Sequence, residues 1–351
     1  QNKGVLFIDE IGTLSYEVQI SLLTAIQDRK FPIAGRSTGS TAATIQTKPV
    51  PCDFALVAAG NYETLEQLHP AFRSRFIGYG YEVTMNEYMD DNPENRNKLI
   101  QFIAQEVHKW NLLPFTRDAC EEIITLAKML SPKQNTLTLS LRKLGGFARI
   151  ASDLATNENK DIVTAIHVKK AIDFSTPIKT QMALKLLHEK AKEKDYGAIT
   201  VISVVSSEAS IGFINVNVIA NEQSEAKTRI IGLKDDSKNI IESVELTRII
   251  INNILPSAKI FSKEIVVEIV GDISPDDIDL TLPILLALVS EILHIRIPPD
   301  ITAAGGVDLH GNILSTRYLG LRLAMCKKLG IKQFIGNITS KEFQYLSLIH
   351  I

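Results

Sequence analysis

The sequence predicts an α/β core at the N-terminal end, a helical region after it, and a separate α+β domain at the C-terminal end. Three observations predict this order. Strand, helix and strand patterns follow one another over residues 4–59, helical patterns fill most of residues 94–173, and Val, Ile and Ser become frequent after residue 197. Such an order is typical of an α/β core with a helical lid, joined to a second folding unit. A chain of 351 residues is long enough for two or three domains.

The first strand is predicted at residues 4–10, where four apolar residues run directly into Asp9 and Glu10. We expect a buried strand whose carboxyl end presents both acids, at the edge where open α/β sheets bind ligands. A strand that ends in this way supplies half of an ATP site, because the aspartate holds Mg²⁺ and the glutamate orients or deprotonates the attacking water. An acidic helix N-cap after a buried strand gives the same pattern without any ligand.

Further polar residues stand where an ATP site needs them. Asn61 follows a second apolar strand, predicted at 54–59, and can hold the attacking water. Arg73 and Arg75 come next, at a place from which an arginine can reach the phosphates of a neighbouring subunit. A solvated helix end is the favoured explanation of either arginine taken alone.

Apolar spacing and turn residues place the remaining elements. In the first half, helices are predicted at 15–29, 94–108, 116–130, 141–156 and 164–173, with a hairpin and a mobile tip at 31–50. In the second half, a charged helix and linker at 174–196 precede two strands joined by a turn at 199–219, further strands at 264–270, 300–304 and 331–335, and helices at 237–253, 280–293 and 319–329.

Composition excludes several classes of protein. Apolar residues make up 45% and charged residues 22% of the chain, which suits a packed globular core. The formal net charge of −2 offers no electrostatic case for binding nucleic acid. The three cysteines have no metal-binding spacing and are expected to be reduced thiols of a cytoplasmic protein. No run of 18 apolar residues predicts a transmembrane helix.

Several segments together resemble the B-type Lon proteases, the membrane-anchored branch of this AAA+ family that is typical of archaea. The segments that carry the resemblance are GVLFIDEI, SLLTAIQDRKFPI, PVPCDFALVAAGN, HPAFRSRFIGYGYEV and LTLSLRKLGG. The resemblance implies that Asp9 and Glu10 are the Walker B pair, with Asp9 on the Mg²⁺ of bound ATP. It further implies that Asn61 is sensor 1, that Arg75 is the arginine finger, and that the hairpin at 31–50 lines a central pore.

The resemblance also divides the chain. It implies the C-terminal part of an AAA+ ATPase core at 1–90, a helical lid at 91–175, a linker at 176–196, a Lon-type proteolytic domain at 197–345 and a non-native tail at 346–351. Members of the family are expected to form rings, usually hexamers, that act on unfolded or misfolded proteins in protein quality control. They work in the cytoplasm or anchored at the cytoplasmic face of a membrane.

Two departures from the family concern the ATPase. No phosphate loop of the form GxxxxGK[ST] occurs, and such a loop needs clustered backbone N–H groups and its lysine. In the family this loop and two membrane-spanning helices precede the position of Gly4, so we expect a truncated chain that binds ATP poorly by itself. Ser140 stands at the position of the sensor 2 arginine, and Arg142 lies roughly 200° further round a helix, which calls nucleotide sensing by the lid into question.

The proteolytic domain of the family pairs a serine nucleophile with a lysine base. Three segments resemble that domain: Lys194–Gly197, Pro299–Leu314 and Cys326–Lys332. A gapless alignment sets the family's Gly-Asp-Ser-Ala-Ser on Asp277–Thr281, which puts Asp279 at the nucleophile position and Arg322 at the base position. An arginine stays protonated and cannot accept a proton. We therefore expect an ion pair where the family has its catalytic dyad.

Other assignments of the nucleophile and base stay open. Ser274 matches Gly-Asp-Ser with one insertion, but its use requires five extra residues before the following helix. Pro283 favours a helix that begins near 279–282, because proline is tolerated in the first turn. Thr281 and Lys327 are further alternatives, which ordinary cap and surface roles explain.

Three functional interpretations follow. The first is a pseudoprotease, an ATP-driven unfoldase or holdase with an inactive peptidase. The second is an active ATP-dependent Ser-Lys endopeptidase whose nucleophile lies elsewhere, and the third is an inactive remnant. Loss of the dyad at Asp279 and Arg322 favours the first or third, Ser140 favours the third, and the retained ATPase residues favour the first.

Overall fold

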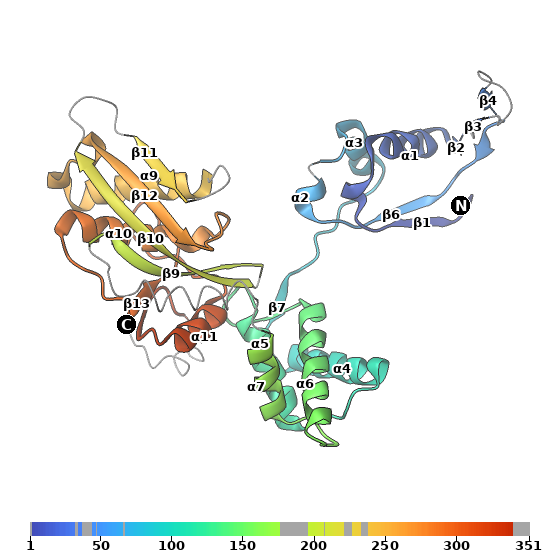
Figure 1. The fold of residues 1–351 in the computed structure, drawn as a ribbon. Coiled ribbons are helices and arrows are strands. Elements are labelled where there is room, and N and C mark those ends of the chain that lie inside the picture. Colours follow the sequence, from blue (N-terminus) through green and yellow to red (C-terminus); the bar gives the residue numbers. More distant parts are fainter. Residues whose placement is uncertain are drawn as a thin grey trace. The chain divides into compact units, whose positions relative to one another are not determined.

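The chain is a mixed α/β protein, seen in Figure 1 as a computed structural model. The structure describes residues 2–31, 34–36, 44–46, 48–65, 67–175, 196–206, 208–220, 227–232 and 238–339. The chain is divided into two compact units, Gln1–Met85 and Asn86–Ile351. The expected linker at 176–196 lies outside the described residues except for Tyr196, and the expected tail at 346–351 lies wholly outside them.

The first unit is built on two parallel strands, β1 (Val5–Ile8) and β6 (Ala55–Ala58), in the register Val5↔Ala55 to Ile8↔Ala58. Its helices are α1 (Tyr16–Asp28), α2 (Tyr62–Leu65) and α3 (Pro70–Tyr79), with a 3₁₀ turn at Ile11–Thr13. Ile11, Leu68 and Phe72 are the buried centre of a cluster that includes Ile8 of β1 and Leu22 of α1.

The expectation that β1 and β6 are buried strands is wrong. Val5 and Phe7 of β1 are 61% and 62% exposed, and Val57 of β6 is 49% exposed. Successive side chains of a strand point to opposite faces, so Leu6 and Ile8 are half-buried while their neighbours are exposed. The apolar run is typical of a strand covered on both faces, yet only one face is covered among the described residues.

The hairpin expected at 31–50 is confirmed in its paired segments. β2 (Lys30–Phe31) pairs antiparallel with β5 (Val50–Pro51), and β3 (Ala34–Arg36) pairs antiparallel with β4 (Thr44–Gln46). The tip between β3 and β4, for which mobility was expected, lies outside the described residues.

Residues 86–175 form the helical part of the second unit. Its helices are α4 (Pro93–Trp110), α5 (Arg117–Met129), α6 (Leu141–Asn157) and α7 (Ala165–Phe174), close to the predicted ranges. Asn92 and Thr116 cap α4 and α5, since each side-chain oxygen accepts a backbone N–H three residues on. Two short strands, β7 (Tyr88–Asp90) and β8 (Thr136–Thr138), pair antiparallel and were not predicted.

Residues 196–339 form the sheet part of the second unit. Its strands are β9 (Ala198–Val205), β10 (Glu208–Ala220), β11 (Thr228–Ile231), β12 (Lys263–Gly271), β13 (Ile301–Ala303) and β14 (Gln333–Ile335). They form one six-stranded sheet in the order β11-β12-β10-β9-β13-β14, with β10 antiparallel to both neighbours and the other pairs parallel. The edge strand β11 was not predicted, whereas the other strands fall near their predicted ranges.

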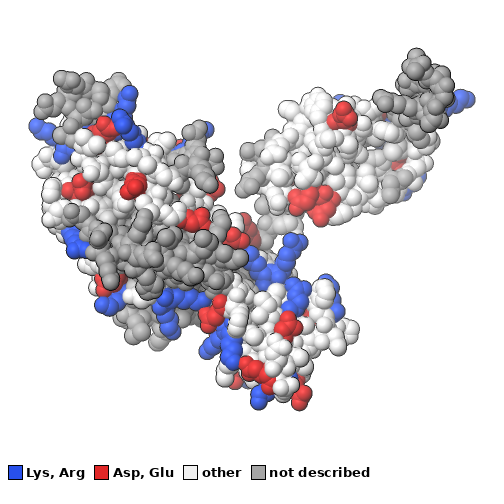
Figure 2. All heavy atoms as spheres, viewed as in Figure 1, with Lys and Arg blue, Asp and Glu red and all other residues white. Residues whose placement is uncertain are grey.

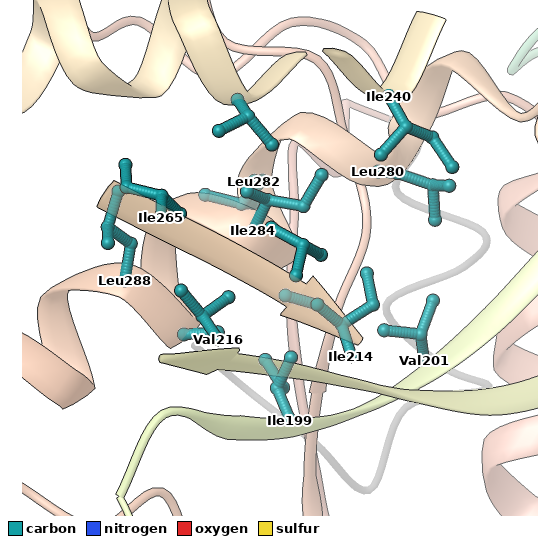
Figure 3. Packing of buried hydrophobic residues seen from close by; sticks show 14 of the residues in the cluster. Ile199, Val201, Ile214, Val216, Ile240, Ile265, Leu280, Leu282, Ile284 and Leu288 are labelled. Atoms are coloured by element: carbon teal, nitrogen blue, oxygen red, sulfur yellow. The ribbon is translucent and has the colours of Figure 1, made fainter. Parts of the chain in front are cut away.

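Helices cover both faces of this sheet. They are α9 (Lys238–Ile254), α10 (Thr281–Leu293) and α11 (Leu319–Leu329), with 3₁₀ turns at Pro256–Ala258, Ile260–Ser262 and Ile278–Leu280. Ile199 and Val201 of β9 point to a cluster with α9 and α10, shown in Figure 3, whereas Ile202 and Val204 point to a cluster with α11. The alternation along β9 therefore assigns α10 and α11 to opposite faces.

Gly197→Ala should destabilise the sheet part more than the matched change Gly330→Ala. Both glycines have a left-handed φ, +73° and +67°, but a Cβ at Gly197 would lie 2.2 Å from the carbonyl oxygen of Val216, while nothing lies within 4 Å at Gly330. We expect Gly330→Ala to cost about 1 kcal/mol of unfolding free energy and Gly197→Ala to cost about 1–3 kcal/mol more. Urea denaturation followed by circular dichroism measures both; equal losses would contradict the steric argument.

Candidate functional site

The carboxyl ends of β1 and β6 bring polar residues to one edge of the first unit. The N–H of Ala59 donates to the carbonyl of Ile8 at 2.8 Å, and the N–H of Ile11 donates to that of Ala59 at 2.9 Å. Asp9 follows β1 and Asn61 follows β6 by three residues, and both are exposed. The parallel register thus places the predicted Asp9 and Asn61 at the same edge.

Glu10 is held in an uncommon backbone conformation at this edge. Its φ of 50° is left-handed, which a non-glycine residue keeps only where its surroundings impose it. Its N–H donates to Oδ1 of Asp9 at 3.0 Å, while its carbonyl accepts the N–H and the hydroxyl of Thr13 at 2.9 and 2.8 Å. The turn therefore holds the backbone that carries the two adjacent acids.

Gly12 fits the 3₁₀ turn against α2 and was not predicted as a site residue. A Cβ at Gly12 would lie 2.3 Å from Cβ of Thr64, and Thr64 donates its hydroxyl to the carbonyl of Asn61 at 2.8 Å. The close approach thus joins the segment after Asp9 to the segment that carries Asn61. A glycine just after the acid pair was the available signal in the sequence.

Both predicted arginines lie on α3 and are half-buried. Arg75 lies beside Gln27 of α1, whose amide oxygen accepts from Nε and Nη2 of Arg75 at 2.7 and 2.6 Å when the amide is turned toward it. The guanidinium is therefore positioned by α1 within its own unit.

The exposed acids at this edge suit a magnesium ion that is shared with phosphate. Mg²⁺ typically keeps several waters and binds one or two protein carboxylates together with substrate phosphates. No group of three or more His, Cys, Asp or Glu side chains that could hold a metal occurs among the described residues. The two exposed carboxylates of Asp9 and Glu10 match the one or two that such an ion takes from a protein.

Ser140 and Arg142 lie at the start of α6 in the helical part. Ser140 is the half-buried N-cap residue and makes no side-chain capping bond. Arg142, in the first turn of α6, is exposed. The turn between the two positions thus directs the arginine to solvent.

A second constellation of charged groups is buried in the sheet part. Nη2 of Arg322 donates to both carboxylate oxygens of Asp277 at 2.9 and 3.0 Å and to Oδ2 of Asp279 at 3.1 Å. Arg322 is 0% exposed, Asp277 4% and Asp279 2%. The predicted residues Asp279 and Arg322 therefore touch, and the ion pair expected between them is present. Asp277 was not predicted; the spacing of two acids before an apolar helix was its only signal.

Backbone groups supply further hydrogen bonds to these three side chains. Nε of Arg322 donates to the carbonyl of Arg317 at 3.0 Å, and Nη1 donates to that of Ile202. Asp277 accepts the N–H of Val204 at 3.0 Å and that of Asp279 at 3.1 Å. The cluster Asp277–Asp279–Arg322, called the buried acid cluster from here on, therefore ties β9 to α11 and to the loop before α10.

The carboxylate of Asp279 also contacts the loop before α11. Its Oδ2 accepts the N–H of Arg317 at 2.9 Å. Burial raises the pKa of the Asp279 carboxyl, and the charge of Asp277 adds to the rise, although Arg322 opposes it. Burial disfavours the charged carboxylate, which is the main physical reason for the raised pKa.

The alternative nucleophiles and base have other partners. The hydroxyl of Ser274 accepts the N–H of Asp276 at 3.3 Å, and the hydroxyl of Thr281 pairs with that of Ser243 at 3.0 Å. Lys327 is exposed on α11. Burial raises the pKa of Cys326, also on α11, to about 12, so this thiol is not ionised at neutral pH.

Two known family models match parts of the chain. Residues 114–175 match the family described as archaeal LonB, AAA+ ATPase LID domain. Residues 1–75 match the family described as sigma-54 interaction domain. The helical part thus carries the lid of an AAA+ ATPase, which its helices α5 to α7 build.

Relatives extend the similarity over most of the chain. The archaeal Lon protease of Thermoplasma volcanium is 39% identical over 89% of this chain and 50% of its own length. Those of Thermoplasma acidophilum and Archaeoglobus fulgidus are each 37% identical over 95% of this chain, and over 53% and 55% of their own lengths. The chain is a homologue of the archaeal Lon proteases, and it spans about half the length of these relatives.

Asp279→Asn should change how the unfolding free energy depends on pH. Because the pKa is raised above its ordinary value of 3.8, the folded protein keeps a proton between the two values that the unfolded chain releases. Asp279 thus contributes stability that is present below pH 3.8 and lost as the pH rises through the folded pKa. The unfolding free energy of the wild type minus that of the variant, from urea titrations, should fall as pH rises.

Asp308→Asn is the control of opposite sign. Hydrogen bonds from Asn312 lower the pKa of the Asp308 carboxyl. The unfolding free energy that Asp308 contributes is therefore present above its ordinary pKa of 3.8 and is lost as the pH falls through the lowered pKa. The unfolding free energy of the wild type minus that of Asp308→Asn should therefore rise with pH. A rise for Asp279 as well would contradict its raised pKa.

Proposed function

We propose that the full-length protein is a Lon-type AAA+ motor whose peptidase site has been replaced by the buried acid cluster. The single observation that carries this proposal is the direct contact of Arg322 with both Asp277 and Asp279. In the proposal, Asp279 and Arg322 occupy the positions of the family's serine and lysine. The domain limits follow the same assignment: ATPase core 1–90, lid 91–175, linker 176–196 and proteolytic-type domain 197–345.

The chemistry of the cluster supports an inactive peptidase. A Ser-Lys pair works because a partly desolvated lysine is neutral and takes the proton of the hydroxyl. The guanidinium of Arg322 stays protonated, and all three of its nitrogens donate hydrogen bonds. A carboxylate held by such a group has no base to assist it and attacks amides poorly.

The polar residues at the carboxyl ends of β1 and β6 support the proposal of an ATP-driven motor. Asp9 would hold the Mg²⁺ that accompanies ATP, Glu10 would orient the attacking water, and Asn61 would hold that water from the neighbouring strand. The bound nucleotide would supply the phosphoryl group that is transferred to water. Arg75 would act at the nucleotide of an adjacent subunit, which implies a ring, proposed to be a hexamer.

Partners and location follow from the motor. Unfolded or misfolded proteins are the proposed substrates, and the cytoplasm or the cytoplasmic face of a membrane is the proposed location. Among the described residues, no helix has the length and apolarity needed to cross a membrane. Charges of both signs are mixed over the face of the helical part in Figure 2, and nucleic acid is not a proposed partner.

Glu10→Gln in the full-length protein should abolish ATP hydrolysis while nucleotide still binds. The amide keeps the size of the side chain but cannot polarise water, so a loss of about 10²-fold or more in kcat is expected. Phosphate release measures hydrolysis, and fluorescent-nucleotide titration measures binding. Undiminished hydrolysis in the variant would remove Glu10 from the mechanism, and no hydrolysis in the wild type would favour the inactive remnant.

Fluorescent casein tests the peptidase. The unaltered full-length protein should not cleave it, with or without ATP, whereas an archaeal Lon protease assayed beside it should. Cleavage by the unaltered protein would refute the pseudoprotease and favour the alternative, an active endopeptidase with its nucleophile elsewhere. The double change Asp279→Ser/Arg322→Lys tests the assignment of positions, since cleavage gained only by this variant would support it.

A further inference from the structure

Gln134 joins the helical part to the sheet part. It lies on the loop between α5 and β8 and is 7% exposed. Its Nε2 donates to the carbonyl of Asn337 at 2.8 Å, and its Oε1 accepts the N–H and the hydroxyl of Thr339, both at 2.8 Å. Because these bonds come from a buried side-chain amide and cross to the sheet part, they fix the position of the loop relative to that part.

Two successive backbone N–H groups connect the same loop to the buried acid cluster. The N–H of Tyr318 donates to the carbonyl of Pro132, two residues before Gln134, at 3.2 Å. The preceding N–H, of Arg317, donates to Oδ2 of Asp279 at 2.9 Å. One dipeptide therefore bonds to the helical part on one side and to the acid cluster on the other.

The conformation of this dipeptide depends on both sets of contacts. Tyr318 has a left-handed φ of 51°, which a non-glycine residue adopts only when neighbouring groups impose it. The carbonyls of Arg317 and Tyr318 accept from Nε and the N–H of Arg322 at 3.0 and 3.1 Å. Leu321, one turn into α11, packs against the buried clusters of both parts.

We propose that Arg317–Tyr318 is a relay through which the position of the loop Ser131–Asn135 sets the geometry of the buried acid cluster. A displacement of the loop alters the bonds of Pro132 and Gln134, and the dipeptide carries the change to Asp279 and Arg322. Coupling between two sites is reciprocal, so a change at Asp279 must alter the loop equally. The relay goes beyond the proposed motor and does not depend on peptidase or ATPase activity.

Residue-resolved hydrogen exchange on the full chain tests the relay. In Gln134→Ala, the N–H of Arg317 should exchange about tenfold faster, while amides of β10 and β12 keep their rates. Lys143→Met is the matched control, because Nζ of Lys143 donates to the carbonyl of Ser206 at 2.7 Å and so joins the same two parts away from the relay. This control should leave the exchange of Arg317 unchanged.

Two results would overturn the relay. An unchanged rate at Arg317 in Gln134→Ala would show that the loop and the cluster are independent, and equal acceleration in Lys143→Met would show that any loosening of the two parts suffices. If Gln134→Ala accelerates exchange throughout the chain, the variant Gln134→Glu is measured instead. Its Arg317 N–H should exchange faster while the amides of β10 and β12 keep their rates, and an unchanged rate at Arg317 would overturn the relay. Glutamate keeps an acceptor for Thr339, loses the donor to Asn337 and Ser315, and places an acceptor oxygen against the carbonyl of Asn337.

Discussion

The guanidinium of Arg322 constrains the sheet part, because each nitrogen of a fully buried cation needs a hydrogen-bond partner. Two carboxylates and two carbonyls from separate segments meet this requirement. Taking such charges out of water costs several kcal/mol per ion, so the arrangement persists only while all partners stay in place. Removal of one partner leaves the others uncompensated, which typically costs about 3–5 kcal/mol. The strand β9, the start of α10 and the loop before α11 are thereby held in one geometry.

The same constraint separates fold from activity. A nucleophile and its base need one group that can gain or lose a proton near neutral pH, whereas the buried acid cluster works by keeping opposite charges in place. Asp279, in the turn before α10, contacts Arg322 of α11, and in the proposed assignment the two stand at the family's catalytic positions without its chemistry. A fold can therefore stay intact while the function of its site changes. The acids at the edge of β1 and β6 differ from this cluster, because they are exposed and lie in a backbone turn.

Local periodicity explains which elements could be predicted. The helices α4 to α7 and α9 to α11 fall close to their expected ranges because each carries several turns of apolar spacing, and several also carry a cap signal. The strands β7, β8 and β11, of three or four residues each, were missed. The prediction that β1 is buried was wrong, because a run of apolar residues shows only that the side chains can be covered. It does not show that both faces of the strand are covered.

The sequence by itself determined the order of elements and the two acids after β1, and it led to the prediction that Asp279 and Arg322 form an ion pair. These follow from patterns within a few residues, or from similarity along the chain. Only the tertiary structure decided that Asp277 joins the cluster, that Gly12 meets Thr64, and that Gln134 reaches Thr339. Each of these contacts joins segments that are separate in the sequence and meet only in the folded chain. The strength of the hydrogen bonds of a buried charge or amide depends on its partners, and no local pattern specifies them.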